Sequence, residues 1–412
     1  MDTQYTQQDQ SRLFILSCIA LTVTAMTFAI RAGILGDLGT QYGLSGTELG
    51  LISSMAFLGF PIATMVGGIL YNMFGPRMLL WIAFIGHAVG LILTIYSSGF
   101  WGLIISTFLI GFANGMVEAA CNPLIAETHE NNKTTMLNKF HVWFPGGIVI
   151  GALVSTGMTE LSYGWELQIA VMLIPTAIYG YMLLKSNFPK LNPLIMSSSE
   201  NIKNLFSPLY IFLVVCMTLT ATTELATGQW INEILAASGA HPMLTLALVT
   251  GIMAVGRYFA GPIVHSLNPV GVLVASAVLS TLGLYLMSQL QGTPVYFAAV
   301  VFALGVTYFW PTMLGCVGEY TPKTGAIGMS LIGGAGMFAV SIWTPIIGRW
   351  MDEAKAQALT QNLSENEMAL ASGQAVLSSL LVLPAILIVA FAALYFYLHK
   401  RGQNHTAVSE AG

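Results

Sequence analysis

Long apolar segments, separated by short polar stretches, dominate the order of residues along this chain. Twelve of them approach the length of about 20 residues that an α-helix needs to cross a bilayer. They lie near 13–36, 49–71, 78–97, 101–126, 137–159, 165–185, 208–236, 243–265, 269–289, 295–317, 325–350 and 374–398. The pattern predicts twelve membrane-spanning helices. The first is expected to be retained, because it is longer than a signal-peptide core and lacks a clear small-residue cleavage site.

The longest polar interruption near the middle of the chain separates the predicted helices into two sets of six. We therefore expect an N-terminal six-helix lobe over residues 1–185, a cytoplasmic linker over 186–207 and a C-terminal six-helix lobe over 208–412. The expected fold class is an all-α membrane protein with twelve transmembrane helices in two lobes. Two equal sets of helices around a short linker are typical of secondary transporters.

Basic residues predict the orientation, because cytoplasmic loops carry an excess of Lys and Arg. With the N-terminus inside, ten of the 14 basic residues are cytoplasmic, two are external and two lie within spans. We expect a multi-pass protein of the plasma membrane, in bacteria the inner membrane, with both termini cytoplasmic. The net charge of −4 suggests no nucleic-acid partner. The expected partners are membrane lipid and a small-molecule substrate, with the chain working as a monomer.

Composition narrows the function further. Charged residues form only 8% of the chain, against about 25% in soluble domains. The four cysteines lie in apolar segments without a CxxC motif or a Cys/His cluster, so neither a disulfide framework nor a metal site is expected. The sequence shows no nucleophile–base pair and no nucleotide-binding motif. We expect a protein that is not an enzyme and uses no cofactor, with a proton as its coupling ion.

One carboxylate interrupts the apolar segment 101–126, at a depth where an ionisable side chain costs several kcal/mol unless it has a partner or faces a cavity. This residue is Glu118, and Asn114 and Asn122 stand four residues to either side of it. That spacing puts all three on one face of a helix. A carboxyl group in such a place can take up and release a proton; a structural ion pair with Arg31 is the alternative.

The segment after the second predicted span, residues 68–77, has the sequence GILYNMFGPR. It resembles the signature of the major facilitator superfamily between helices 2 and 3, with Asn72 where Asp is usual. The resemblance implies two lobes that alternate access to a central cavity, and gating roles for Asn72 and Arg77. Arg257, toward the cytoplasmic end of the eighth span, is a third gating candidate, with helix packing as its alternative.

Two shorter segments resemble a narrower group, the fucose–galactose–glucose:proton symporter family. They are GMVEAACNPLIAE at 115–127 and TELATGQWINEIL at 223–235. The resemblance implies that Glu118 carries the coupling proton and that the seventh helix contributes to the substrate site. The chain departs from the family in the first helix, where Arg31 stands near the position of a key Asp. A guanidinium group binds carboxylates in bidentate fashion, so an anionic substrate is an alternative to a sugar.

The candidate substrate-binding residues combine charged, amide and aromatic side chains. They are Arg31, Asn114, Asn122, Glu224, Gln229, Trp230 and Trp310. Tryptophan offers a flat apolar face for a sugar ring, and amides satisfy hydroxyl groups. Trp310 precedes Pro311, which predicts a kink in the tenth span. His141, at the start of the fifth span, is expected to be an interfacial residue, with proton transfer as its alternative.

The leading functional prediction is proton-coupled import of a hexose or a related sugar or polyol by alternating access. An organic-anion symporter that uses Arg31 is one alternative, and a drug or metabolite exporter is another. The exporter is less favoured, because FPGGIVIG in the fifth span supplies only a fragment of the glycine series of the antiporter signature. A transporter-like sensor or scaffold without flux is the remaining alternative.

Overall fold

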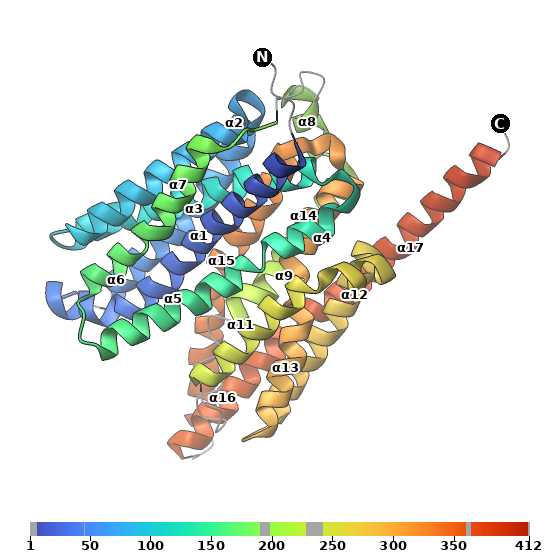
Figure 1. Ribbon diagram of the computed structural model, residues 1–412. Coiled ribbons are helices and arrows are strands. Elements are labelled where there is room, and N and C mark those ends of the chain that lie inside the picture. The colour runs from blue at the N-terminus through green and yellow to red at the C-terminus, as the bar shows by residue number, and fades with distance from the viewer. Residues whose placement is uncertain (1–5, 45, 190–197, 228–241, 360–363, 411–412) are drawn as a thin grey trace.

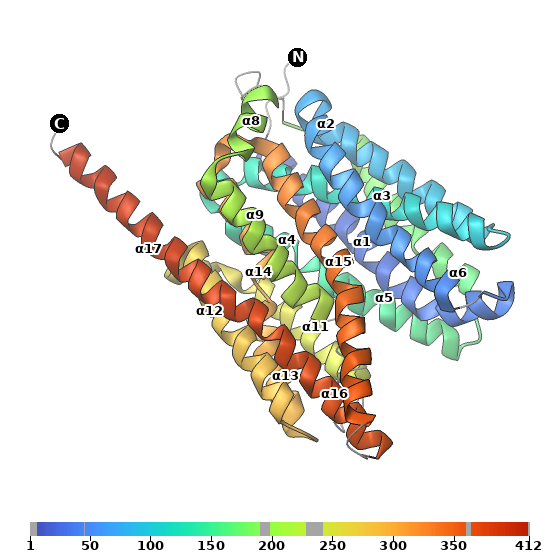
Figure 2. The same ribbon diagram turned by 180° about the vertical axis from the view of Figure 1, so that it is seen from behind.

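The computed structural model describes residues 6–44, 46–189, 198–227, 242–359 and 364–410, and every regular element in these ranges is a helix (Figure 1). The first group comprises α1 (Gln7–Tyr42), α2 (Gly46–Ile95), α3 (Phe100–Thr128), η1 (Glu130–Asn132), α4 (Lys133–Phe140), α5 (Trp143–Glu160), α6 (Trp165–Val171) and α7 (Leu173–Lys185). A short helix, α8 (Ser198–Leu205), precedes the second group. The second group comprises α9 (Pro208–Ala221), η2 (Thr222–Ala226), α11 (Pro242–Tyr258), α12 (Ala260–Gln289), α13 (Pro294–Val306), α14 (Phe309–Tyr320), η3 (Pro322–Thr324), α15 (Gly325–Leu359), α16 (Glu365–Leu380) and α17 (Val382–Glu410). Both views show the two groups as neighbouring bundles, called here the N-lobe and the C-lobe (Figure 2).

The predicted spans are present in the described part of the chain. Ten helices there are long and apolar enough to cross a membrane. One of them, Leu51–Ile95, contains two predicted spans, because α2 turns sharply at Gly75. A further span is α11, whose 17 residues end at Tyr258. The all-α fold with twelve spanning segments is therefore confirmed.

The two lobes share a turn geometry between equivalent helices. Gly75 has φ 76° and is followed by Pro76 in the turn between the second and third spans. Asn268 has φ 56° and is followed by Pro269 in the turn between the eighth and ninth spans. Glycine adopts a positive φ without strain, and asparagine is the side chain that tolerates it next best. The repeated turn indicates that the lobes are two copies of one six-helix plan.

Within the N-lobe, two glycines bring α5 close to α1. A Cβ atom on Gly147 would lie 2.7 Å from the Cβ of Ala25, and one on Gly151 would lie 2.9 Å from the Cβ of Ala29. Both distances are too short for real side chains, so only glycine permits this approach. The α1–α5 pair forms one wall of the space between the lobes.

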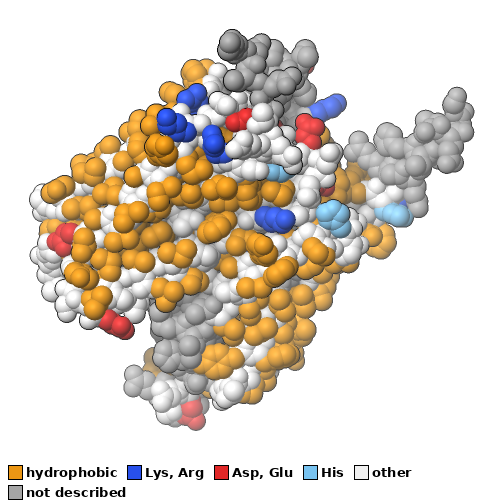
Figure 3. Space-filling model, viewed as in Figure 1, with side chains coloured by type: hydrophobic (Ala, Val, Ile, Leu, Met, Phe, Trp, Pro, Cys, Tyr) orange, Lys and Arg blue, Asp and Glu red, His pale blue; other side chains and the backbone are white. Residues whose placement is uncertain are grey.

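Both chain ends lie toward one end of the molecule (Figure 1). In the space-filling view, Lys and Arg side chains gather toward this end, while apolar side chains cover the flanks (Figure 3). An apolar belt with basic residues beyond it is the distribution that a membrane-spanning protein requires. We call this end of the bundle the terminal end.

Candidate functional site

A cavity of about 580 Å³ lies between the two lobes. Its volume falls within the range of small-molecule sites, about 300–1,000 Å³. The N-lobe supplies Phe28, Ala29, Ala32, Gly33, Phe57, Phe144, Pro145, Ile148, Ala152, Ser155 and Thr156, and the C-lobe supplies Glu224, Leu225, Val249, Thr250, Met253, Phe302, Val306, Met337 and Val340. Among these lining residues Glu224 alone carries a charge. The wall is therefore largely apolar and aromatic, with a few hydroxyl groups and one carboxylate.

Glu118 lies on α3 behind this cavity and is only 4% exposed. Asn122, one helical turn further on, donates a hydrogen bond of 2.5 Å from its amide nitrogen to Oε2 of Glu118. The Nε2 atom of His141 lies 3.1 Å from Oδ1 of Asn122 and 3.8 Å from Oε2 of Glu118. The first contact joins two residues that their i, i+4 spacing places on one helix face. The second was not predicted, because His141 follows α4 and is distant in sequence.

Arg257 on α11 lies opposite this group, in the C-lobe, and is 1% exposed. Its Nε donates to the carbonyl of Thr307 at 2.7 Å, and its Nη1 donates to the carbonyl of His141 at 3.2 Å. Each carbonyl belongs to the residue four positions before a proline, Pro311 or Pro145. Proline has no N–H and cannot make the i to i−4 helical bond. Both acceptors therefore lack that bond. Arg257 donates to the Thr307 carbonyl within the C-lobe and to the His141 carbonyl across the lobe interface.

The third bond of Arg257 is an ion pair. Its Nη2 lies 2.7 Å from Oε1 of Glu224, which sits on η2, a single π-helical turn after α9. The other oxygen of Glu224, Oε2, is buried and has no hydrogen-bond partner among the described residues. Because Glu224 lines the cavity, a hydroxyl or another donor there could use this oxygen. A continuous series of polar contacts thus runs from Glu118 through Asn122, His141 and Arg257 to the cavity wall.

Two other candidate substrate ligands, Asn114 and Trp310, do not line the cavity. Asn114 is fully buried in the N-lobe: Nε2 of His87 is 2.8 Å from its Oδ1, and its Nδ2 donates to Thr27 at 3.0 Å. The ring of Trp310 packs against α15, where a Cβ atom on Gly336 would approach it to 3.0 Å. Both side chains are occupied within their own lobes. Gln229 and Trp230 lie outside the described residues.

Arg31 is close to the cavity but does not line it. Its guanidinium carbon lies 5.2 Å from the ring centre of Phe28, one turn earlier on α1. Phe28 and Ala32 are both lining residues. No acidic side chain pairs with Arg31 in the described ranges, so the alternative of an ion pair with Glu118 does not apply to this conformation.

Polar contacts close the space between the lobes at the terminal end. Asn72 of α2 donates to Oδ1 of Asn201 at 2.7 Å, and Asn201 of α8 donates to the carbonyl of Lys323 at 2.8 Å. Thr134 of α4 donates to Glu319 of α14 at 2.5 Å. These bonds place Asn72 where a gate is expected.

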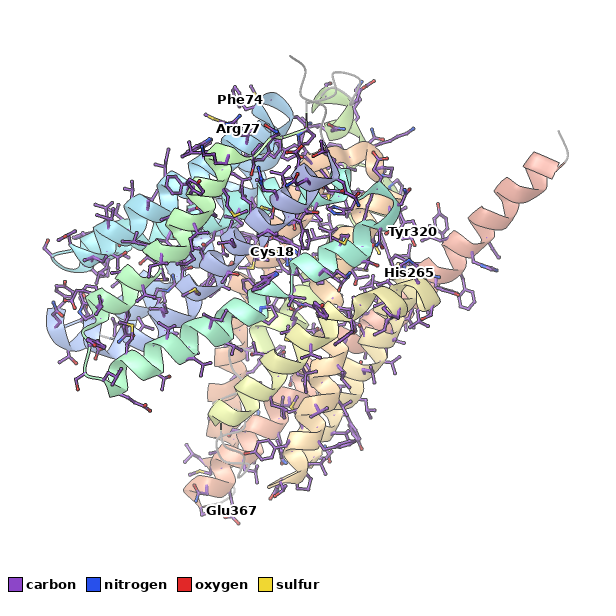
Figure 4. The ribbon with its side chains drawn as sticks, in the orientation of Figure 1. Cys18, Phe74, Arg77, His265, Tyr320 and Glu367 are labelled. Atoms are coloured by element: carbon purple, nitrogen blue, oxygen red, sulfur yellow. The ribbon has the colours of Figure 1, made fainter. Side chains whose placement is uncertain are left out.

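Arg77 does not take part in these contacts. It is exposed, and its guanidinium carbon lies 6.0 Å from the ring centre of Phe188. The stick view shows Arg77 beside Phe74 at the terminal end, with Cys18 deep in the N-lobe and Glu367 at the opposite end (Figure 4). In this conformation Arg77 has no partner among the described residues of the C-lobe that would make it a gate.

Two bundles of six helices, closed together at one end and enclosing a cavity with buried charges at their interface, define the class of an alternating-access membrane transporter. The family model of the Major Facilitator Superfamily matches residues 16–344. The chain belongs to this superfamily, which confirms the resemblance seen after the second span and indicates a non-enzymatic carrier.

Individual relatives are distant. Myo-inositol transporter 1 of Candida albicans is 24% identical over 176 residues, which are 41% of this chain and 32% of that protein. The chain thus matches about a third of that relative's length. The structure is similar to that of the E. coli fucose:proton symporter, with a TM-score of 0.69 and 16% identity, covering 91% of this chain and 98% of that one. It is also similar to the human organic anion transporter TETRAN, with a TM-score of 0.73 and 14% identity, covering 93% and 99%. At these identities the structures establish a shared fold alone.

Proposed function

We propose that this protein imports a hexose or a related sugar or polyol together with a proton. The observation that carries the proposal is the position of Glu118. Its carboxyl group is buried at membrane depth and contacts Asn122 and His141. The carbonyl of His141 accepts from Arg257, which pairs with Glu224 in the wall of the cavity between the lobes. An ionisable group is rare at such depth unless it serves transport or proton transfer.

The shape of the molecule suggests which step of transport it represents. The lobes are bonded together at the terminal end, through Asn72, Asn201 and Lys323. The cavity wall uses residues from the second half of α1 and from the part of α5 beyond Phe144, which lie away from that end. If the terminal end is cytoplasmic, as the basic residues predict, this conformation is closed toward the cytoplasm.

The chemistry of the cavity favours a neutral, hydroxyl-rich substrate. Hydroxyl groups can donate to the unoccupied Oε2 of Glu224, while the ring faces of Phe28 and Phe144 can cover the C–H side of a sugar. The guanidinium group of Arg257 already pairs with Glu224 and donates to two carbonyls, and Arg257 does not line the cavity. The names of a polyol transporter and of a sugar symporter among the similar proteins agree with this substrate class.

Import of an organic anion is the second candidate, and Arg31 is the observation that favours it. This side chain has a cationic head beside the cavity, with only the ring of Phe28 as a described partner. A rotation about its side-chain bonds could bring the guanidinium group to a carboxylate. The printed name of one protein of similar structure, an organic anion transporter, agrees with this substrate class.

Uptake into proteoliposomes under an imposed proton gradient tests the proposal. The panel contains myo-inositol, L-fucose, D-xylose, D-glucose and the sugar acid D-glucuronate. We expect Glu118→Gln to abolish accumulation while it spares exchange of labelled for unlabelled substrate, because Gln mimics the protonated acid but releases no proton. Glu160→Gln, an exposed change at the end of α5, is the matched control. Full proton-driven accumulation by Glu118→Gln would remove Glu118 from the mechanism, and saturation by glucuronate alone would favour the anion candidate.

A further inference from the structure

His141 was expected at the membrane interface, with proton transfer as the alternative, but the structure buries it at 2% exposure between the lobes. It lies in the break between α4, which ends at Phe140, and α5, which begins at Trp143. Its side chain contacts Asn122 and Glu118 in the N-lobe, and its backbone carbonyl accepts from Arg257 in the C-lobe. One residue at a helix break thus touches both the buried carboxyl group and the opposite lobe.

We infer that His141 is the positioning residue through which the protonation of Glu118 changes the contact between the lobes. The inference rests on the proposed proton coupling at Glu118 and extends it. The groups that connect Glu118 to the opposite lobe are then the amide of Asn122, the imidazole ring of His141 and the backbone carbonyl of His141.

The hydrogen-bond directions explain how the signal could travel. An ionised carboxylate only accepts, so Asn122 must turn its amide N–H toward Glu118 and its carbonyl oxygen toward His141. His141 must then donate through Nε2–H. A proton placed on Oε2 of Glu118 makes that oxygen a donor. When that O–H donates to Asn122, the amide of Asn122 reverses, and His141 keeps its bond to Asn122 as the other tautomer, accepting through Nε2.

Three charged or titratable groups surround His141 and would respond to its change of tautomer. Glu118 of α3 faces its ring, and Arg257 of α11 holds its carbonyl, with Glu224 of η2 behind the guanidinium group. Movement of the ring at a helix break shifts the same residue's carbonyl, which carries the bond between the lobes. Proton uptake by Glu118 in the N-lobe thereby changes the hydrogen bonding of Arg257, which forms the ion pair with Glu224 at the cavity wall.

A distance measurement that needs no substrate tests the inference. Spin labels on Glu160→Cys, at the end of α5, and Gln291→Cys, between α12 and α13, report the separation of the lobes away from the terminal end. The four native cysteines are buried, which favours labelling at the introduced sites. Pulsed electron resonance on the full chain then gives the distance distribution at mildly acidic and mildly alkaline pH.

We expect the ratio of the two populations to change with pH by about tenfold, which corresponds to about 1.4 kcal/mol of coupling free energy. His141→Leu should lose this response. His141→Gln should keep most of it, because a carboxamide can donate or accept. The matched control is His87→Leu, a fully buried histidine of the same lobe that contacts Tyr179 and Asn114; it should respond like the parent chain. Size-exclusion profiles show which variants fold.

A normal pH response in His141→Leu would overturn the inference, as would the absence of any response in the parent chain. Failure of the proposed function looks different. In that case the distances respond to pH, yet no member of the uptake panel is accumulated together with protons. If His141→Leu fails to fold, His141→Ser takes its place, because its hydroxyl group is too short to reach Asn122. Loss of the response in folded His141→Ser, together with a retained response in His141→Gln, supports the assignment, and a retained response in His141→Ser contradicts it.

Discussion

Replacing Arg257 by Met removes the group that joins the lobes beside the cavity. The side chain is buried and donates to Glu224 at 2.7 Å, to the Thr307 carbonyl at 2.7 Å and to the His141 carbonyl at 3.2 Å. Breaking a buried ion pair from one side costs about 3–5 kcal/mol, because the other charge stays without a partner. Each abandoned carbonyl adds about 1–3 kcal/mol. The stranded carboxylate of Glu224 is therefore the largest part of the expected loss.

A double-mutant cycle separates these contributions. Thermal unfolding of the purified protein would be followed for Arg257→Met, Glu224→Gln and the double variant. We expect each single variant to be destabilised, and Glu224→Gln to stabilise the Arg257→Met background, since a neutral amide replaces the unpaired charge. The coupling free energy should be about 2–3 kcal/mol, near the upper end for residues in contact.

The exposed ion pair Arg349–Glu353 provides the matched control. Its atoms are 2.8 Å apart, close to the 2.7 Å of the buried pair, but the side chains are 80% and 53% exposed. A surface pair four residues apart on a helix contributes only about 0.3–0.5 kcal/mol. A coupling free energy as small as that of this control would show that removal of Arg257 does not leave Glu224 as an unpaired buried charge.

Two further predictions address the substrate and the topology. Arg31→Lys should change the half-saturation concentration by less than about tenfold if the substrate is neutral; a bidentate carboxylate contact would lose about 2–5 kcal/mol, or on the order of 30-fold or more, and glucuronate would then inhibit uptake. Single cysteines at Ser98 and Lys203, both exposed in the structure, should react with impermeant reagents from opposite sides of the membrane, Ser98 from outside. Labelling of position 203 from outside intact cells would reverse the predicted orientation.

The helices were predictable because each span has a local cause. About 20 apolar residues suffice to mark a membrane helix, and Gly75 and Pro76 mark the turn between two of them. The contact of Asn122 with Glu118 was equally local, since it follows from i, i+4 spacing on one helix. The kink before Pro311 is also present, with α13 ending at Val306 and α14 beginning at Phe309.

The polar stripe on α3 was less continuous than its spacing suggested. Eight residues of an α-helix turn the face by about 80°, so Asn114 and Asn122 point in different directions. Asn114 meets His87 of α2 and Thr27 of α1 inside the N-lobe, whereas Asn122 meets His141 at the lobe interface. Which neighbour covers each face depends on tertiary packing, and no periodicity on a single helix contains that information.

The contact between Arg257 and the N-lobe depends on backbone atoms, which residue types do not reveal. Its acceptor is the carbonyl of His141, which lacks the i to i−4 helical bond because Pro145 has no N–H, and which otherwise accepts from the N–H of Phe144 at 3.4 Å. This choice suits a pair of lobes that must separate. When they part, Arg257 loses one hydrogen bond to His141, worth about 1.5–3 kcal/mol for a charged donor, but keeps Glu224 and Thr307 in its own lobe. An ion pair between the lobes would instead strand a buried charge, at about 3–5 kcal/mol. Two conformations that interconvert must lie within a few kcal/mol of each other, so a carbonyl at this position is compatible with alternating access where a carboxylate would oppose it.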